Sequence, residues 1–171
     1  LIHPGGGDGG AYDKQRLVLF AEAPPLEGPV AAEASESPRA FTAGRAPGVL
    51  PGFVPLGVSI CHEILYPDVV HGAVAHGAQL LVNIANDGWL DGGFGVASRQ
   101  HFAMSVFRAV EAHRYLVRAA TTGVSGIIDP NGPAGAALVA QREPYGTKIC
   151  GRPWCGNHGL FASVEGSASA G

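Results

Sequence analysis

Charged residues are scarce in this chain of 171 residues, at 15% of the total, and they form no basic run. Eleven Lys and Arg stand against fourteen Asp and Glu, which gives a formal net charge of −3. Nucleic-acid partners are recognised through clustered positive charge, so we expect no nucleic acid to bind. Low charge together with 46% hydrophobic residues also excludes a charge-rich disordered chain and favours one folded core.

Long apolar runs are absent as well. None approaches the roughly 18 to 20 residues that a membrane-spanning helix needs, and no signal-peptide pattern opens the chain. We therefore predict no membrane span within these residues. The chain starts at Leu1 and its only methionine is Met104, so we interpret the sequence as a fragment that begins inside a domain.

Glycine (26 residues) and proline (13 residues) are abundant and gather near the start, between residues 24 and 51, and in the tail. Their density predicts an irregular loop insertion over 24–51 and an irregular or disordered tail over 142–171. Between these segments, apolar β-friendly runs alternate with helical periodicities, which predicts an α/β fold. The expected strands are 16–20 (or an extended segment), 53–61, 79–84, 115–120, 124–129 and 136–140, and the expected helices are about 67–77 and 98–114, with Ser98 as a cap.

Two patterns that could bind a ligand are weak. The Gly5 to Gly10 loop contains G-x-G-x-x-G, but an extended segment follows where a phosphate-binding helix should begin. Cys150, Cys155 and His158 lack the paired C-x2-C of zinc sites, and a Cys150–Cys155 disulfide or unpaired thiols both stay open. We predict no metal site and no cofactor.

Cys61 is the candidate nucleophile, because a thiol at the junction of a buried strand and a helix can be held rigidly at a cleft. The alternative is an inert core cysteine. An unperturbed thiol is only a few per cent thiolate at neutral pH, so a nearby ammonium and carboxylate would raise its reactivity. Lys14, Glu22 and Glu63 can supply those charges, although Lys14 can equally be a solvated loop lysine.

Several ordered blocks of the sequence resemble the nitrilase superfamily and, within it, the apolipoprotein N-acyltransferase family. The resemblance covers about residues 1 to 140 and rests on Tyr12-Asp13-Lys14-Gln15-Arg16-Leu17-Val18-Leu19-Phe20-Ala21-Glu22, the run 55–68 around Ser59-Ile60-Cys61-His62-Glu63, the run 77–89 ending in Asn86-Asp87-Gly88-Trp89, Gln100-His101, Arg108-Ala109-Val110-Glu111, Thr122-Gly123-Val124-Ser125 and Asp129-Pro130-Asn131-Gly132. Four positions depart from the family pattern: Leu19 replaces Pro, Ala21 replaces Gly, Ala23 replaces Tyr, and His62 replaces Tyr.

The resemblance implies a nitrilase-like α-β-β-α sandwich, present here as an incomplete C-terminal portion over residues 1–141. It also implies that Cys61 is the nucleophile, Lys14 the catalytic lysine, and Glu22 and Glu63 carboxylates near the site. Backbone N–H groups at Cys61 and His62, with Lys14, would stabilise an oxyanion. The family's general base, a glutamate, is expected upstream of Leu1.

The implied activity is acyl transfer from a phospholipid to the amine of an apolipoprotein's diacylglyceryl-cysteine, through a thioester on Cys61. A full-length parent would act at the bacterial inner membrane, with the catalytic domain on the periplasmic side and the membrane contact made by an N-terminal region absent here. Two alternatives are a soluble carbon–nitrogen hydrolase that acts on a small amide and a remnant that only binds. We expect the isolated chain of 171 residues to be inactive and poorly folded, and sustained acyl transfer by it would contradict this expectation.

Overall fold

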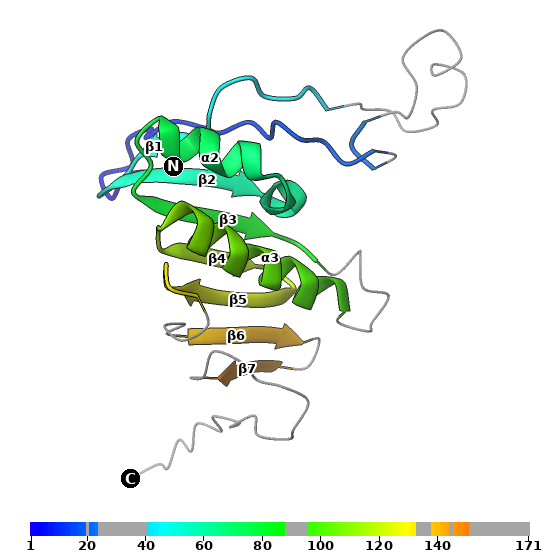
Figure 1. Ribbon diagram of the computed structural model, residues 1–171. Coiled ribbons are helices and arrows are strands. Elements are labelled where there is room, and N and C mark those ends of the chain that lie inside the picture. Colours follow the sequence, from blue (N-terminus) through cyan, green and yellow to red (C-terminus); the bar gives the residue numbers. More distant parts are fainter. Residues whose placement is uncertain (20, 24–40, 88–95, 133–137, 144–145, 151–171) are drawn as a thin grey trace, which may run out of the picture.

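A computed structural model of the chain describes residues 1–19, 21–23, 41–87, 96–132, 138–143 and 146–150 (Figure 1). These residues form one mixed sheet of seven strands, whose spatial order follows the sequence from β1 to β7. The strands are β1 (Val49–Pro51), β2 (Pro55–Ile60), β3 (Leu80–Ala85), β4 (Leu116–Ala120), β5 (Gly123–Ile128), β6 (Leu138–Glu143) and β7 (Gly146–Cys150).

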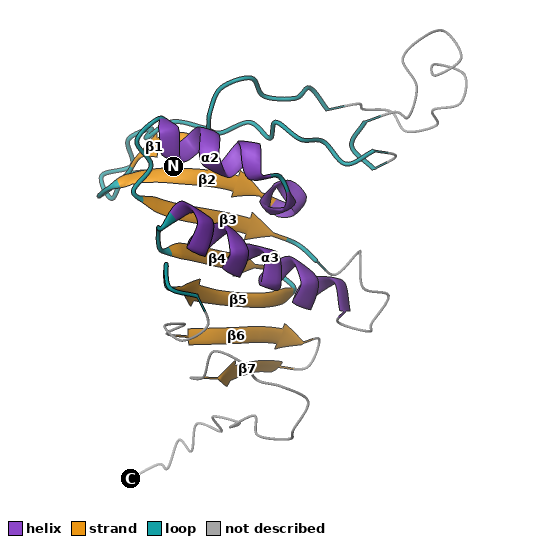
Figure 2. Ribbon diagram, in the orientation of Figure 1, coloured by secondary structure: helices purple, strands orange, loops and turns teal. Residues whose placement is uncertain are grey.

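The centre of the sheet is parallel and its flanks are antiparallel. β2, β3 and β4 run parallel, joined by crossovers that contain the 3-10 helix η1 (Cys61–Leu65) with α2 (Pro67–Ala75), and α3 (Val96–Ala112). β1 pairs antiparallel with β2, and β4 to β7 form an antiparallel meander. Both helices cover the same face of the sheet (Figure 2). The α/β fold predicted from the sequence is confirmed.

The hydrophobic core lies between that face and the two helices. Its buried members come from η1, α2, α3 and three strands: Ile64, Val70, Leu81, Ala109, Ala112, Leu116 and Ile128. Phe102, Met104 and Val106 of α3 pack against this cluster. Pro67 opens α2, where its missing N–H costs no hydrogen bond, and the backbone after this helix turns at Gly77, whose φ is +97°.

The other face of the sheet is also apolar. In β3, Leu81, Asn83 and Ala85 are buried, whereas Ile84 between them is 46% exposed. Ile127 of β5 is 40% exposed next to buried Ile128. Apolar side chains on both faces are expected of a sheet that is covered on both sides, and the described residues cover only one. Among these residues, no helix is long and apolar enough to cross a membrane.

The structure differs from the sequence prediction at both loop-rich segments. β1 lies inside the predicted 24–51 insertion. β6 overlaps the predicted strand 136–140, but its last two residues and all of β7 lie in the predicted irregular tail. β1 and β7 have only three and five residues, so their periodicity is weak, and pairing with a neighbouring strand supplies their order. Residues 151–171 and 24–40 lie outside the described residues.

Smaller differences concern element ends. Ser98 is the third residue of α3 in the described part of the chain and is not its cap. Residues 16–19 form no strand and make only an isolated bridge between Leu19 and Ala23. The predicted turn at Pro130-Asn131-Gly132 is confirmed, with Gly132 at a φ of +84° and its N–H bonded to the Asp129 carbonyl at 2.9 Å.

Two glycines near α2 provide a matched test of the backbone. A Cβ would meet no atom within 4 Å at Gly72 or Gly77, but only Gly77 has a positive φ. Gly72→Ala should therefore stabilise the protein by about 0.5–1 kcal/mol, whereas Gly77→Ala should destabilise it by roughly 1 kcal/mol. Thermal melting of the protein made from its complete gene measures both, and shifts of the same sign would contradict the assigned backbone.

Candidate active site

Cys61 stands at the carboxyl end of β2, where the strand passes directly into η1. Its side chain is a free thiol and the residue is 8% exposed. Its φ is +55°, a left-handed conformation that is uncommon outside glycine and that persists only where surrounding contacts hold it. The predicted strand-to-helix junction at Cys61 is thus confirmed, and the residue's backbone is held in a strained conformation.

Glu63, two residues further on, is completely buried. One carboxylate oxygen accepts the N–H groups of Gln15 at 2.6 Å and Arg16 at 2.9 Å, and the other accepts the N–H of Ile60 at 2.7 Å. The Tyr12 hydroxyl donates to both oxygens at 3.1 and 3.0 Å. Glu63 therefore ties residues 12–16 to the turn that carries Cys61. Burial, followed by the negative charge of Glu63, raises the pKa of Tyr12, so this hydroxyl keeps its proton and remains a donor.

Lys14 lies within this tied segment, and its Nζ is 2.7 Å from both carboxylate oxygens of Glu22. The lysine side chain is 10% exposed and the glutamate side chain is 26% exposed. Burial raises the pKa of Glu22, but the Lys14 hydrogen bond, the Val18 N–H and the Lys14 charge outweigh it and hold that pKa below its usual value. Lys14 is a largely buried, paired ammonium and not a solvated loop lysine.

Backbone contacts support the same pair from a second segment. The Gly44 N–H donates to the Lys14 carbonyl at 2.8 Å, and the Phe41 N–H donates to the Glu22 carbonyl at 3.1 Å. In Figure 1 the first residues and residues 41–48 accordingly run side by side above α2. The described end of the 24–51 insertion therefore borders the Lys14–Glu22 pair.

His62 follows the thiol and is partly buried. Its ring contacts the Tyr66 ring edge-on, with centroids 5.4 Å apart. Burial, and then the positive charge of Lys14, lower the pKa of His62, so the imidazole is neutral at pH 7. This effect also shows that Lys14 lies within electrostatic range of the residue next to Cys61.

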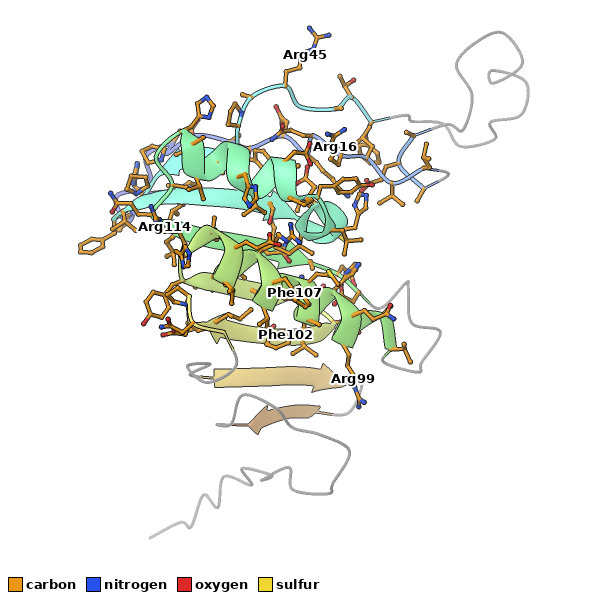
Figure 3. All side chains as sticks on the ribbon, in the orientation of Figure 1. Arg16, Arg45, Arg99, Phe102, Phe107 and Arg114 are labelled. Atoms are coloured by element: carbon orange, nitrogen blue, oxygen red, sulfur yellow. The ribbon has the colours of Figure 1, made fainter. Side chains whose placement is uncertain are left out.

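Arg16 and Arg45 are exposed cations of the two flanking segments. Arg16 pairs with Asp68 of α2, and its guanidinium lies 5.5 Å from the centre of the Tyr66 ring. Figure 3 shows Arg16 beside α2, whereas Arg45 points away from the molecule. Neither side chain is part of the buried cluster around Glu63.

A second buried cluster lies next to Cys61, on the face of the sheet that α3 covers. The sequence analysis did not identify it. Asn83 of β3, Arg118 of β4 and Asp87 are each buried to 1% exposure or less. Arg118 donates to the Asn83 side-chain oxygen, to Asp87 at 2.7 Å and to the Val124 carbonyl at 3.2 Å. Burial raises the pKa of Asp87, but hydrogen bonds and charge from His101 and Arg118 outweigh it and keep that pKa below its usual value.

The sequence held a signal for this second cluster. Asn83 and Arg118 each interrupt an apolar strand at an inward-facing position, and the two are direct partners in the β3–β4 register. A polar residue at a core position of a strand needs a buried partner. Gly123 completes the arrangement, because its φ is +103° and a Cβ there would lie 2.6 Å from an Asp87 carboxylate oxygen.

The structure therefore links Lys14, Glu22 and Glu63 to the turn at the start of η1 that carries Cys61 and His62. It does not bring Cys150 there, because Cys150 ends β7 and β2 lies near the other side of the sheet. Cys155, His158 and Trp89 lie outside the described residues.

Comparisons with known proteins show the family of this chain. The carbon-nitrogen hydrolase family matches residues 1–144. The chain is 38% identical over 135 residues to the apolipoprotein N-acyltransferase of Geobacter metallireducens, covering 77% of this chain and 26% of that protein. It is 40% identical over 141 residues to the enzyme of the same name from Methylococcus capsulatus, covering 78% of this chain and 27% of that protein. The chain thus spans about a quarter of the length of these relatives.

Solved structures show the same fold. The NitN amidase from Nesterenkonia sp. AN1 matches with a TM-score of 0.53 and 25% identity, over 81% of this chain and 49% of that one. The NitFhit protein of C. elegans matches with a TM-score of 0.57 and 24% identity, over 83% of this chain and 34% of that one. The fold is therefore an incomplete nitrilase-like one, as the sequence predicted. The chain belongs to the carbon-nitrogen hydrolase family, and the curated relatives that it resembles are apolipoprotein N-acyltransferases.

Proposed function

We propose that this chain carries the acyl-transfer site of an apolipoprotein N-acyltransferase, with Cys61 as nucleophile and Lys14, Glu22 and Glu63 as its supporting charged residues. The observation that carries the proposal is the Glu63 clamp. It joins the segment that holds the buried Lys14–Glu22 pair to the turn that holds Cys61 in a left-handed conformation. A cysteine held rigidly at a strand end, in a turn bonded to the segment that carries an ammonium and a carboxylate, is suited to nucleophilic catalysis.

In the first half-reaction, the Cys61 sulfur attacks the acyl carbonyl of a phospholipid ester. The thiol proton passes to a carboxylate base, and the carbonyl electron pair moves onto oxygen. Lys14 and the backbone N–H groups of Cys61 and His62 stabilise that oxyanion. Collapse of the tetrahedral intermediate expels the lysophospholipid alkoxide, which takes up a proton, and leaves a thioester on Cys61.

In the second half-reaction, the neutral α-amine of an apolipoprotein's diacylglyceryl-cysteine attacks the thioester. The new amide bond forms as the amine proton passes to the carboxylate base and the C–S bond breaks, and the released Cys61 thiolate regains that proton for another cycle. Both partners are membrane lipids or lipid-anchored, so we place the reaction at the bacterial inner membrane, on its periplasmic side. Segment 41–48, whose backbone bonds to Lys14 and Glu22, would border the path of the acyl chain.

The second candidate function is hydrolysis of a small amide by the same thiol and lysine. It is favoured by the fold match to an amidase, whose share of identical residues is 25%. The two activities part at the second half-reaction, since an amidase passes its acyl group to water. Protein made from the complete gene, loaded with a radiolabelled phospholipid, should retain the label until a diacylglyceryl-cysteine peptide is added. Spontaneous loss of the label, with ammonia release from short amides, would favour the amidase.

The nucleophile can be assigned by mass. Cys61→Ser should abolish the trapped acyl-thioester in the protein made from its complete gene, because the hydroxyl is a much weaker nucleophile than the thiolate. Cys150→Ser is the matched control, since Cys150 ends β7 away from the site, and it should leave the adduct in place. Intact-mass spectrometry after incubation with phospholipid measures both. Adduct on both variants would overturn the assignment of Cys61.

The role of the buried ammonium is tested by Lys14→Met, which keeps most of the side-chain volume and removes the charge. Loss of one oxyanion-stabilising group should slow acyl-enzyme formation by about 10²-fold or more. Arg45→Met removes an exposed cation from the neighbouring segment and should leave the rate unchanged. Quenched-flow sampling of the acyl-enzyme gives the rates, and equal losses in the two variants would show that bulk charge matters instead of Lys14.

The Glu63 clamp predicts a graded pair of effects. Tyr12→Phe removes one donor and should cost about 1–2 kcal/mol of unfolding free energy. Glu63→Gln turns an amide NH₂ toward backbone donors, so it should cost more and slow acylation on the order of 10²-fold by displacing Lys14. Urea unfolding and acylation rates check the order. A Glu63→Gln protein that acylates at the wild-type rate would contradict the clamp.

A further inference from the structure

The carbonyl of Cys61 has a side-chain partner that the mechanism above does not use. The Asn83 amide nitrogen donates to that carbonyl at 3.2 Å. The same nitrogen donates to the Ser59 hydroxyl at 3.0 Å and to the Ser59 carbonyl at 3.3 Å. Asn83 is completely buried, so its contacts to the strand end below the thiol are shielded from water.

This hydrogen bond fixes more than a carbonyl. The peptide group that joins Cys61 to His62 is planar and trans, so its C=O and N–H bonds lie in one plane and point in opposite directions. Asn83 lies on the buried side of the sheet end and draws the carbonyl inward. The His62 N–H therefore points away from Asn83.

Asn83 is itself held by charge. Arg118, 0% exposed at its side chain, donates to the Asn83 oxygen, which fixes the amide so that its nitrogen faces Cys61. Asp87 holds the guanidinium at 2.7 Å, and His101 lies 3.1 Å from the second oxygen of that carboxylate. Each member has few other orientations available, because the strand register, Gly123 and α3 close the space around it.

We propose that Asn83, locked by the buried Arg118–Asp87 pair, is a positioning residue that aims the His62 N–H at the oxyanion of the acyl intermediate. The inference rests on the proposed function. It adds a remote device to that function, since Asn83 touches neither the sulfur nor the substrate and acts through the Cys61–His62 peptide plane. Removing Asn83 should slow carbonyl addition selectively and leave the nucleophilicity of the thiol intact.

Two reactions of the same sulfur separate these effects. Attack on p-nitrophenyl butyrate forms an S–C bond while the carbonyl electron pair moves to oxygen, and its return expels p-nitrophenolate. Attack on iodoacetamide forms an S–C bond while iodide leaves, and no oxyanion develops. Stopped-flow measurement of the p-nitrophenolate burst and of the alkylation rate therefore reports oxyanion stabilisation and thiol reactivity independently.

The variants are Asn83→Asp, which keeps the shape but presents no donor to Cys61, and Asn83→Ala, which adds no charge. Both are made in the protein from its complete gene, beside Ile128→Val, a core truncation outside the network. The burst should slow by about 10²-fold in either Asn83 variant, while alkylation stays within about threefold of the wild type. Ile128→Val should leave both rates unchanged. If Asn83→Asp does not fold, Asn83→Ala decides alone.

A burst as fast in the folded Asn83 variants as in the wild type overturns the role of Asn83 and leaves the proposed function standing. Equal slowing of burst and alkylation also overturns it, because the thiol itself would then be affected. A wild-type protein that gives no burst and no acyl adduct on Cys61 overturns the acyl-enzyme function, and the inference with it.

Discussion

The rest of the site depends on the hydrogen bonds that the buried side chain of Glu63 accepts. An ionised or protonated carboxyl group cannot be buried without partners, and here four donor groups from two distant parts of the chain converge on it. The segment from Tyr12 to Arg16 has no strand or helix of its own, so these bonds and the Gly44 N–H on the Lys14 carbonyl hold it in place. Lys14 inherits its position from them, and Glu22 then fixes the lysine's terminal nitrogen.

Two buried polar systems thus meet at the start of η1. Glu63 joins the N-terminal segment to Ile60, and Asn83, held by Arg118 and Asp87, binds the Cys61 carbonyl from the sheet. In the proposed mechanism the first set of bonds positions Lys14 and the second positions the His62 N–H. Both are costly to build, because each buries ionisable groups that must be fully paired. Cys61 lies where the two systems meet and has a left-handed backbone conformation. Such a conformation persists only where surrounding contacts hold it, and these two systems provide such contacts.

The sequence carried much of this information, though unevenly. Apolar runs and turn residues predicted β2, β3, β4 and both helices within a few residues, because burial of these segments leaves a periodic apolar pattern in the sequence. β1 and β7 escaped, since strands of three to five residues flanked by glycine and proline depend on pairing for their order. The resemblance named Cys61, Lys14, Glu22 and Glu63, but their grouping rests on backbone donors such as Gln15 N–H, which no residue pattern displays. The sequence shows Asn83 and Arg118 as polar interruptions of apolar strands, but only the strand register of the structure shows that they are partners.

Side chains along β3 alternate between the two faces of the sheet, so the proposed role of Asn83 depends on the register of this strand. Asn83 faces the helices and reaches the Cys61 carbonyl, while its neighbour Ile84 faces the opposite side of the sheet. A shift of β3 by one position would exchange these two roles, burying an isoleucine under the thiol turn and turning the amide outward. An insertion or deletion of a single residue within β3 would therefore disturb the proposed chemistry as well as the packing.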